Sequence, residues 1–507
     1  MSLFIDSNEN SPYVNDTGWA KNCHVCFGAD YSEDCLYCES VYYSRSALDC
    51  LYCYNVEVSY ECVDCKDCHT LLFSQGCTTC ADSAFLFDCI GCNHCFGCVG
   101  LRHKTYCMFN KQLSQEEYKK KVDTYLPFTL SSIQRSSEAT LQCKLQHPHR
   151  AFIGNNNENV IGNHLFNAKN VEYCFDSTDI EDVKYATNMR GAKDCQDINY
   201  WGHPGELCYE CMAVGEGATR LAFCIASWGG CENLYYCHAC IACRDCFGCK
   251  GLRHKRYCIL NKQYSKEQYE SLVPRLIEYM KKTQEWGEMF PVTFSDFAYN
   301  ETPAQEYHPL SKEEVEHRGW RWLQETNESL KVAKVIPASQ LPEKIGDIPD
   351  DILNWAIECE TTKRPFKIAK QELDFYRAQK LPIPHFHPDE RHRRRMLMRN
   401  PRKLWKRQCA NCQKEIQTSY APDRPEIVYC EEFARVIEPE STCFPSITRR
   451  VPTQSLPWKN GGATGGIRSP LEENSISLEH SDRISTSCPQ PFREWRCMFW
   501  QTRTANS

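Results

Sequence analysis

Three cysteines near the C-terminus have the spacing of a zinc site. Cys409 and Cys412 form a CxxC pair, and Cys430 follows after a spacer of 17 residues. Zinc favours four tetrahedral ligands, and a CxxC pair supplies two thiolates from one turn. A zinc ribbon would place a fourth cysteine at position 433, where this chain has Phe433. We therefore predict a zinc site here, with an incomplete set of cysteines.

A weaker candidate set of ligands lies upstream of these cysteines. It resembles the remains of a similar site and consists of Cys359, His387, Glu390 and His392. Cysteine, histidine and glutamate all bind zinc. The alternative interpretation is that these histidines are ordinary surface polar residues.

A basic run at residues 391–407 separates the two candidate sets and contains no acidic residue. Such a run, with a tryptophan inside it, suits RNA or DNA binding by charge and stacking. The predicted nucleic-acid-binding residues are Arg393, Arg394, Arg395, Arg399, Arg402, Lys403, Trp405 and Lys406. The alternatives are a solvated helix face and a helix that pairs with acidic residues of the same chain.

The cysteines of the N-terminal half all fall in one register of three. From Cys23 to Cys107, every third residue is cysteine or another small or apolar residue, with Lys104 as the only charged exception. Strands alternate with period two and helices with period 3.6, so a period of three requires another structure. A narrow β-helix with short coils fits, because its corners turn the chain before alternation is established, and a fixed repeat indicates a solenoid.

The same cysteines also form three CxxC-x8-CxxC groups, 27 residues apart, beginning at Cys23, Cys50 and Cys77. A metal array or thiol-redox chemistry is therefore an alternative to a packed core. From Gly162 the register of three returns, but with mostly aliphatic residues up to Trp201. Aliphatic side chains cannot replace zinc thiolates, so we predict that the cysteines pack as small hydrophobic residues. We assign no certain cofactor to the solenoid. Its outward aspartates could be ligands, but we expect them to be solvated turn residues; they are Asp34, Asp49, Asp64 and Asp88.

A twin element shows that the solenoid is duplicated. Residues 95–112 return 151 positions later as residues 246–263, and each copy is followed by a serine and a capping-box residue. Each module should therefore end in a covering helix. We expect residues 129–170 to be a loop-rich linker.

The totals favour a cytoplasmic protein. The chain has 507 residues, 36 cysteines and a formal net charge of −7. Its first residues lack the apolar region of a signal peptide, and no run is long enough to span a bilayer, so we expect no membrane partner. In a reducing compartment the cysteines would be free thiols or metal ligands.

The predicted fold is mainly β: two short-coil β-helix or solenoid modules with cysteine-lined interiors, each capped by a helix, and a small zinc-ribbon-like C-terminal domain. The last segment has no periodicity, and our hypothesis is that it is disordered and either read out of frame or replaced. The predicted divisions are 19–110 for module one, 111–160 for a capping helix and linker, 161–262 for module two, 263–325 for a helical segment, 326–352 for a linker, 353–433 for the basic zinc-ribbon-like domain and 434–507 for the tail.

Several of these motifs resemble a known family. The twin element, Tyr299–Thr302, Arg399–Trp405 and Ala421–Cys430 are similar to a cysteine-rich bacterial family of small-genome lineages, over about residues 19–432. Its members are often labelled CaiB/BaiF family, after a class of CoA transferases. The family ends in CxxC where this chain has Phe433. The resemblance would imply CoA transfer, but the chain has no nucleotide-binding fingerprint and no long α/β alternation.

We therefore predict a non-enzymatic, zinc-associated scaffold or binding protein whose basic C-terminal domain contacts nucleic acid, with further protein partners. A metal-binding or thiol-redox cysteine array is the second hypothesis, and CoA transfer is the third.

Overall fold

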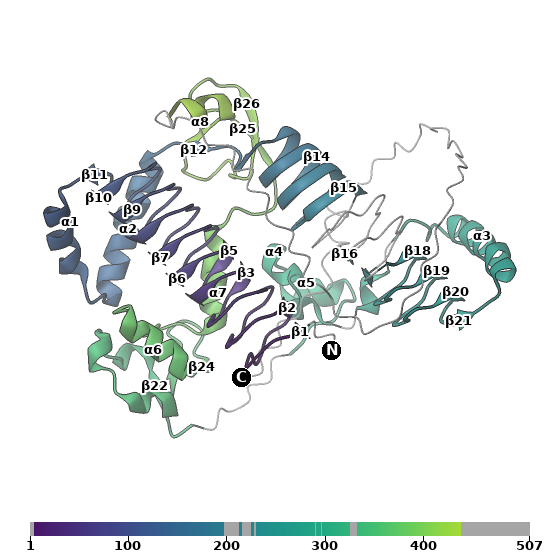
Figure 1. Cartoon of the computed structure of the whole chain (residues 1–507), viewed down its shortest axis with the longest axis horizontal. Coiled ribbons are helices and arrows are strands. Elements are labelled where there is room, and N and C mark those ends of the chain that lie inside the picture. Colours follow the sequence, from purple (N-terminus) through teal and green to yellow (C-terminus); the bar gives the residue numbers. More distant parts are fainter. Residues whose placement is uncertain are drawn as a thin grey trace, which may run out of the picture.

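The computed structural model describes residues 5–196, 212–214, 225–227, 230–288, 290–295, 297–324 and 332–437. Strands are more abundant than helices and form several separate sheets, which confirms a mainly β protein. Two stacks of short strands lie next to each other, with helices at their outer ends and C-terminal segments packed against the first stack (Figure 1). No helix of the described ranges is long and apolar enough to cross a membrane.

The first stack covers residues 5–112 and is built from parallel strands. Paired residues are 12 positions apart, as in Glu57 with His69 and Cys95 with Cys107, so each coil of 12 residues lies on the next. Only the final strand pairs antiparallel. The strands are β1 (Ile5–Asp6), β2 (Thr17–Gly18), β3 (Glu39–Tyr42), β4 (Arg45–Leu48), β5 (Leu51–Tyr54), β6 (Glu57–Tyr60), β7 (His69–Leu72), β8 (Ala81–Ala84), β9 (Asn93–Phe96), β10 (Thr105–Met108) and β11 (Lys111–Gln112).

The backbone explains the period of three. Every third residue from Ser7 to Phe109 has a positive φ. A left-handed residue turns the chain, so no segment is straight for long enough to alternate. The residue after each turn faces inward, which places four side chains inside each coil. Most turn residues are not glycine, although asparagine and aspartate, which tolerate this conformation best, are frequent among them.

The inward cysteines of the first stack are buried thiols with hydrogen-bond partners. Cys62 is fully buried, and its Sγ donates to the carbonyl oxygens of Tyr60 at 3.6 Å and Leu71 at 3.2 Å. Cys26 makes the same two kinds of contact, to His24 and Cys35. Burial raises the pKa of the Cys62 thiol well above its usual value. The Cys62 thiol therefore packs as a neutral, small side chain.

The second stack runs from Gly154 to Gln263 and has a largely aliphatic interior. Leu165, Val171, Ile180 and Met189 are buried in its first part, and cysteines from Cys231 onward are buried in its last part. The inserted loop predicted at residues 202–205 lies outside the described residues. The strands are β13 (Gly154–Asn155), β14 (Glu158–Lys184), β15 (Arg190–Gln196), β16 (Met212–Val214), β17 (Ile225–Ser227), β18 (Glu232–Tyr235), β19 (Arg244–Phe247), β20 (Arg256–Ile259) and β21 (Lys262–Gln263).

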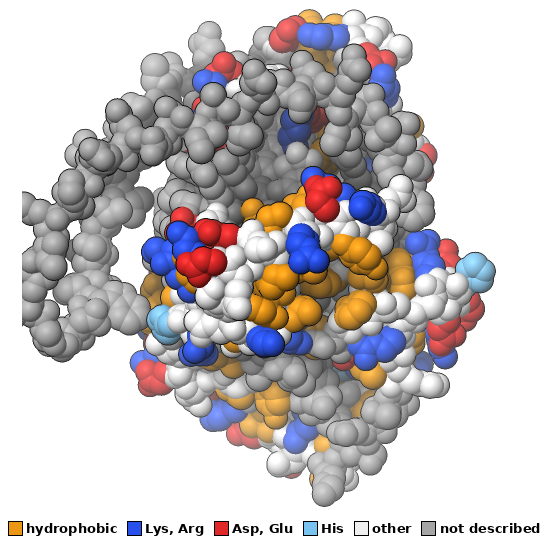
Figure 2. All heavy atoms as spheres, turned by 90° about the vertical axis from the view of Figure 1, so that its right-hand side faces the viewer, with side chains coloured by type: hydrophobic (Ala, Val, Ile, Leu, Met, Phe, Trp, Pro, Cys, Tyr) orange, Lys and Arg blue, Asp and Glu red, His pale blue; other side chains and the backbone are white. Residues whose placement is uncertain are grey.

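Each stack ends beside a capped helix, as the twin element predicts. Helix α1 (Gln115–Val122) begins at Ser114, and α3 (Lys266–Lys282) begins at Ser265, each with a complete capping box. Hydrophobic side chains gather between Lys and Arg side chains on the face that carries α3 (Figure 2). Leu260 and Tyr279 are among the exposed hydrophobic residues of this end.

The expectation that residues 129–170 are mainly loop is wrong. Helix α2 (Leu130–Gln146) occupies much of this range and is capped by Thr129. Its serines suit close packing: Ser136 is buried, and its hydroxyl donates to the Ser132 carbonyl at 2.8 Å. The Lys144 Nζ also lies 3.9 Å from the ring centre of Phe87, which holds the helix against the first stack.

The segment between the second stack and the C-terminal residues contains short helices. They are η2 (Val292–Phe294), η3 (Tyr299–Glu301), α4 (Ala304–Tyr307) and α5 (Lys312–His317). A further 3₁₀ turn, η1 (Asp123–Tyr125), directly follows α1. Tyr307 of α4 contacts the first stack, because its hydroxyl lies 2.6 Å from that of Tyr52. The segment therefore lies between the two stacks (Figure 1).

Residues 332–437 form what we call the C-terminal unit. The predicted linker does not hold for residues 334–352, because Ile336, Leu341, Ile345 and Ile348 are buried in a shared core. The prolines in this range predicted a linker, but Pro337 and Pro349 directly precede short 3₁₀ turns. The elements are β22 (Lys334–Pro337), η4 (Ala338–Gln340), η5 (Ile345–Asp347), η6 (Asp350–Asn354), β23 (Trp355–Glu358), β24 (Pro365–Phe366), α6 (Lys370–Ala378), α7 (Pro388–Met398), β25 (Trp405–Gln408), β26 (Glu415–Thr418), β27 (Val428–Tyr429) and α8 (Glu431–Ile437). The predicted tail lies almost wholly outside the described residues.

Candidate metal centre

The first two cysteines of the predicted zinc site lie on a tight turn. Strands β25 and β26 pair antiparallel, and the turn between them carries Cys409 and Cys412. The Cys409 amide donates to the Lys414 carbonyl, and the Gln413 amide donates back to the Cys409 carbonyl, both at 2.9 Å. Gln413 has a φ of 60°, the left-handed conformation that lets the chain turn so sharply. The turn aims both thiols in one direction.

The third cysteine comes from a different strand. Strand β12 (His149–Arg150) pairs in parallel with β27, which ends immediately before Cys430 and helix α8. The Cys430 amide donates to the Cys409 Sγ at 3.3 Å, and the Sγ atoms of Cys412 and Cys430 are 3.8 Å apart. All three sulfur atoms lie within 4.8 Å of one another.

This geometry suits a thiolate-bound metal. Four sulfurs at zinc–sulfur bonds of about 2.3 Å would be about 3.8 Å apart in a tetrahedron. Burial disfavours the Cys409 thiolate, but amides of Cys412, Cys430 and Asn411 stabilise it and lower the Cys409 pKa to about 6. Cys409 and Cys430 are buried, whereas Cys412 is exposed. Phe433 packs against the same small core and offers no ligand atom.

The weaker candidate set repeats part of this geometry without forming a site. The Cys359 amide donates to the Arg364 carbonyl, the Lys363 amide donates to the Cys359 carbonyl, and Lys363 has a φ of 59°. This is the turn seen at Cys409, again between paired strands, here β23 and β24.

The remaining residues of the weaker set have other contacts. Glu390 receives the Arg393 and Arg394 guanidiniums at 2.7 and 2.9 Å. The His387 Nδ1 accepts from the Asp389 amide, and burial lowers the His387 pKa to about 4. No three of Cys359, His387, Glu390 and His392 bring ligand atoms within 4.8 Å of one another. The prediction of a metal site there is therefore not supported.

Helix α7 carries the first half of the basic run and packs along the first stack. The fully buried Asp49 carboxylate accepts from both Arg391 and Arg395, the latter at 2.7 Å. Arg391 also reaches Glu372 at 3.3 Å and Tyr376 at 3.0 Å. The expectation that Asp49 is a solvated turn residue is therefore wrong: its outward side chain is covered by α7.

The next two arginines connect the two stacks. Arg399 binds Asp64 of the first stack at 3.0 Å and Asp176 of the second stack. Arg402 also binds Asp176 at 2.8 Å and donates to the Tyr52 hydroxyl at 2.9 Å. Asp64 is mostly buried, with 13% of its side chain exposed. We call these four charged residues the arginine clamp.

The clamp and Asp49 change the prediction for the basic run. Arg395, Arg399 and Arg402 were assigned to phosphates, but each is bound to carboxylates of the same chain. A phosphate could replace these partners only if the packing opened. The geometry favours the alternative in which the helix pairs with acidic residues of the stacks. Arginine spacing of four at 391, 395 and 399 was the sequence signal for such a helix face.

The remaining predicted nucleic-acid residues lie nearer the surface. Arg393 and Arg394 are exposed and share Glu390. Lys403 and Lys406 are exposed, and Trp405 is partly exposed, with the Lys403 Nζ 5.3 Å from its ring centre.

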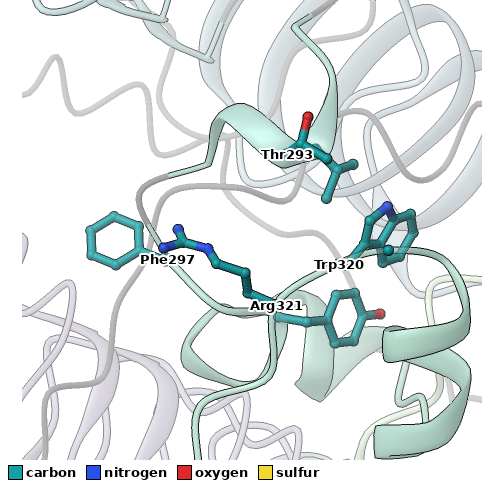
Figure 3. Close-up of a pocket in the computed structure, with 7 residues that line it drawn as sticks. Thr293, Phe297, Trp320 and Arg321 are labelled. Atoms are coloured by element: carbon teal, nitrogen blue, oxygen red, sulfur yellow. The ribbon is translucent and has the colours of Figure 1, made fainter.

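A small pocket lies in the segment between the second stack and the C-terminal unit. Figure 3 shows Arg321 extending toward Phe297, with Trp320 and Thr293 on the other side. The Tyr299 and Trp320 rings stack at 5.7 Å, and Arg321 donates to the Ser295 carbonyl. The pocket lining contains no carboxylate, imidazole or thiol, so it offers no acid–base or nucleophilic pair.

Comparisons with known proteins identify no family. No family model and no curated protein matches the chain. Among solved structures, one similar chain is a candidate acetyltransferase from Desulfovibrio desulfuricans G20, at 8% sequence identity. The match covers 45% of this chain and 66% of that chain, slightly under two thirds, with a TM-score of 0.11. Such a score supports no conclusion about fold or activity.

Proposed function

We propose that this protein is a non-enzymatic scaffold whose C-terminal unit carries a structural zinc site. The convergence of the Cys409, Cys412 and Cys430 thiols carries this proposal. In this view, both stacks are short-coil β-helices, and the C-terminal unit is a zinc-ribbon-like domain that joins them. Parallel pairing at a spacing of 12 residues in the first stack, and mostly of 12 in the second, supports the first part. The turn at Cys409 supports the second part.

Zinc would reinforce the contact between two parts of the chain that already share a small core and the hydrogen bond from the Ala410 amide to the Val428 carbonyl. Cys409 and Cys412 belong to the β25–β26 turn, whereas Cys430 starts helix α8. Three thiolates fill three of the four positions that zinc requires. Water or a side chain of a protein partner would take the fourth position, because Phe433 cannot.

The zinc content of purified full-length protein tests this proposal. We expect Cys412→Ser to lose one zinc per chain relative to the wild-type protein. Cys412 is exposed, so this change should not disturb folding. Cys143→Ser is the matched control, because Cys143 is partly exposed and does not belong to the group of Cys409, Cys412 and Cys430. Equal zinc content in wild-type and Cys412→Ser protein would refute the proposal.

The same measurement separates the scaffold from a cysteine array. Of the described residues, only two groups place three metal-ligating atoms within 4.8 Å, and neither includes a cysteine of the stacks. We therefore expect the stacks to hold no zinc. Three or more tightly bound zinc ions in the Cys412→Ser protein would favour the array.

Nucleic-acid binding is a second candidate function, and it depends on the exposed part of the basic run. Trp405 is partly exposed beside the zinc turn, and the Lys403 Nζ lies near its ring. Lys406 is exposed on the same strand and pairs with Glu415 at 3.0 Å. Arg393 and Arg394 add charge on the outer face of α7. Aromatic side chains next to cations suit single-stranded nucleic acid.

Salt dependence of RNA binding tests the second candidate. With four exposed cations, the logarithm of the binding constant for a single strand should fall with the logarithm of the salt concentration, with a slope no steeper than about −3. We expect Lys403→Glu with Lys406→Glu to weaken binding, and Lys414→Glu, on the neighbouring turn, to serve as the control. A slope near zero, or equal affinity in all three proteins, would contradict nucleic-acid binding.

A further inference from the structure

Three metal-ligating side chains converge where three distant segments meet. Glu39 lies on β3 of the first stack, Glu306 on α4 and His392 on α7. The His392 Nε2 lies 3.3 Å from a Glu39 oxygen and 3.4 Å from a Glu306 oxygen. All three ligand atoms lie within 4.8 Å of one another.

This spacing matches a metal coordination sphere. In the plane of the three ligand atoms, the point equally far from all of them lies about 2.0–2.4 Å from each. This range includes zinc–nitrogen and zinc–oxygen bond lengths. The groups are also shielded, because the exposed side-chain fractions are 7% for His392, 10% for Glu39 and 20% for Glu306. A cation could therefore bind between these side chains without large movements of the chain.

The two carboxylates of this group suit a divalent cation. Two carboxylates so close together in a buried place repel each other. A divalent cation bound between them would stabilise both carboxylates at once. One imidazole and two carboxylates form a harder donor set than three thiolates, which suits manganese, ferrous iron or zinc.

We propose that Glu39, Glu306 and His392 form a second metal site, which binds a divalent transition-metal ion. The site is independent of the zinc site at Cys409. It fastens α4 to both the first stack and α7, in addition to the contact between Tyr307 and Tyr52. It also gives His392 a role outside the weaker candidate set, in which it was expected to accompany Cys359.

Manganese binding to full-length protein tests this proposal. After treatment with a chelator, protein is titrated with Mn²⁺, and the free ion is followed by electron paramagnetic resonance. We expect one bound Mn²⁺ per chain in both wild-type and Cys412→Ser protein, because thiolates are poor ligands for manganese. Glu306→Gln and His392→Gln should weaken binding by about tenfold or more, since even outer partners of a ligand contribute that much.

Two controls keep the outcomes distinct. Glu313→Gln changes an exposed glutamate on the neighbouring helix α5 and should bind Mn²⁺ like the wild-type protein. Glu306 is the most exposed of the three ligands, so Glu306→Gln remains informative if His392→Gln does not fold. Equal affinity in wild-type and Glu306→Gln protein would overturn the proposal. The proposal would also be overturned if Cys412→Ser protein bound neither Mn²⁺ nor Zn²⁺. The three residues would then form only an ion pair between the histidine and the glutamates.

Discussion

Asp49 shows how one residue organises the contact between helix α7 and the first stack. Its carboxylate is fully buried and bound to the guanidiniums of Arg391 and Arg395. Taking charges out of water is costly, so the arrangement holds only while every partner is present. Removing Asp49 would leave two buried cations with incomplete partners.

We predict that Asp49→Asn lowers the free energy of unfolding by about 3–5 kcal/mol, the usual cost of breaking a buried ion pair. Urea unfolding followed by circular dichroism would measure this loss. Asp67→Asn is the matched control, because Asp67 is an exposed residue with the same left-handed backbone in the same stack. A loss at Asp49 no larger than that at Asp67 would contradict the account of the buried contact.

His149 makes stability depend on pH. Burial, with Lys144 nearby, lowers the His149 pKa to about 4. The unfolded chain therefore takes up a proton near its ordinary pKa of about 6.5, while the folded protein does not. Stability is full above that value and falls as the pH drops toward 4.

We expect His149 to account for about 2 kcal/mol of lost stability between about pH 7.5 and pH 5. Comparing unfolding of the wild-type protein and His149→Gln at both pH values isolates this contribution, because the variant should lose it. His103→Gln, at an exposed histidine, controls for loss of an imidazole elsewhere. An unchanged pH dependence in His149→Gln would show that burial at this position has no such effect.

At the scale of elements, the coils tolerate small inward side chains of different chemistry. Ser74 lies one coil after Cys62 in the same inward column, and its hydroxyl donates to the Leu72 carbonyl at 2.8 Å. Cys62 donates to the equivalent carbonyl, that of Tyr60. A serine at position 62 can therefore keep the hydrogen bond.

We predict that Cys62→Ser costs about 1 kcal/mol or less, whereas Cys62→Leu costs about 1–3 kcal/mol because it overfills the coil. Neither change should alter zinc content. Thermal unfolding and metal analysis of both variants check this. Loss of zinc in Cys62→Ser would mean that the inward thiols bind metal rather than pack.

The sequence predicts some elements well and others poorly, for physical reasons. The inward register and the capping boxes at Ser114 and Ser265 are local patterns, and the structure contains both. Helix α2 was missed because its serines resemble a linker until their packing is known. The three cysteines of the candidate site were found by spacing. The burial of Asp49 and the grouping of Glu39 with His392 depend on contacts hundreds of residues apart, which no local pattern contains.

At the scale of the whole molecule, the arginine clamp holds the two stacks together. Asp176 of the second stack has 6% of its side chain exposed, and both Arg399 and Arg402 bind it. Since Arg399 also binds Asp64, the first stack is linked to the second through one guanidinium. The two arginines hold the Asp176 pKa well below its usual range, although burial opposes this effect.

We predict that Asp176→Asn loosens the contact between the stacks without unfolding either one. Amide hydrogen exchange should become faster in α7 and at the facing edge of the second stack, while the interior of the first stack stays protected. Asp182→Asn is the control, because Asp182 is exposed and shares the left-handed backbone of Asp176. Unchanged exchange in Asp176→Asn would show that the clamp does not hold the stacks.

X-ray absorption at the zinc edge identifies the atoms that bind zinc. Full-length protein is freed of metal and given one equivalent of zinc, which thiolates should bind in preference to carboxylates. We predict three sulfur atoms at about 2.3 Å and one lighter atom around zinc in the wild-type protein. In Cys412→Ser protein the sulfur signal should be partly or wholly lost. A zinc ion surrounded only by nitrogen and oxygen, or an unchanged sulfur signal in the variant, would contradict a zinc site at Cys409, Cys412 and Cys430.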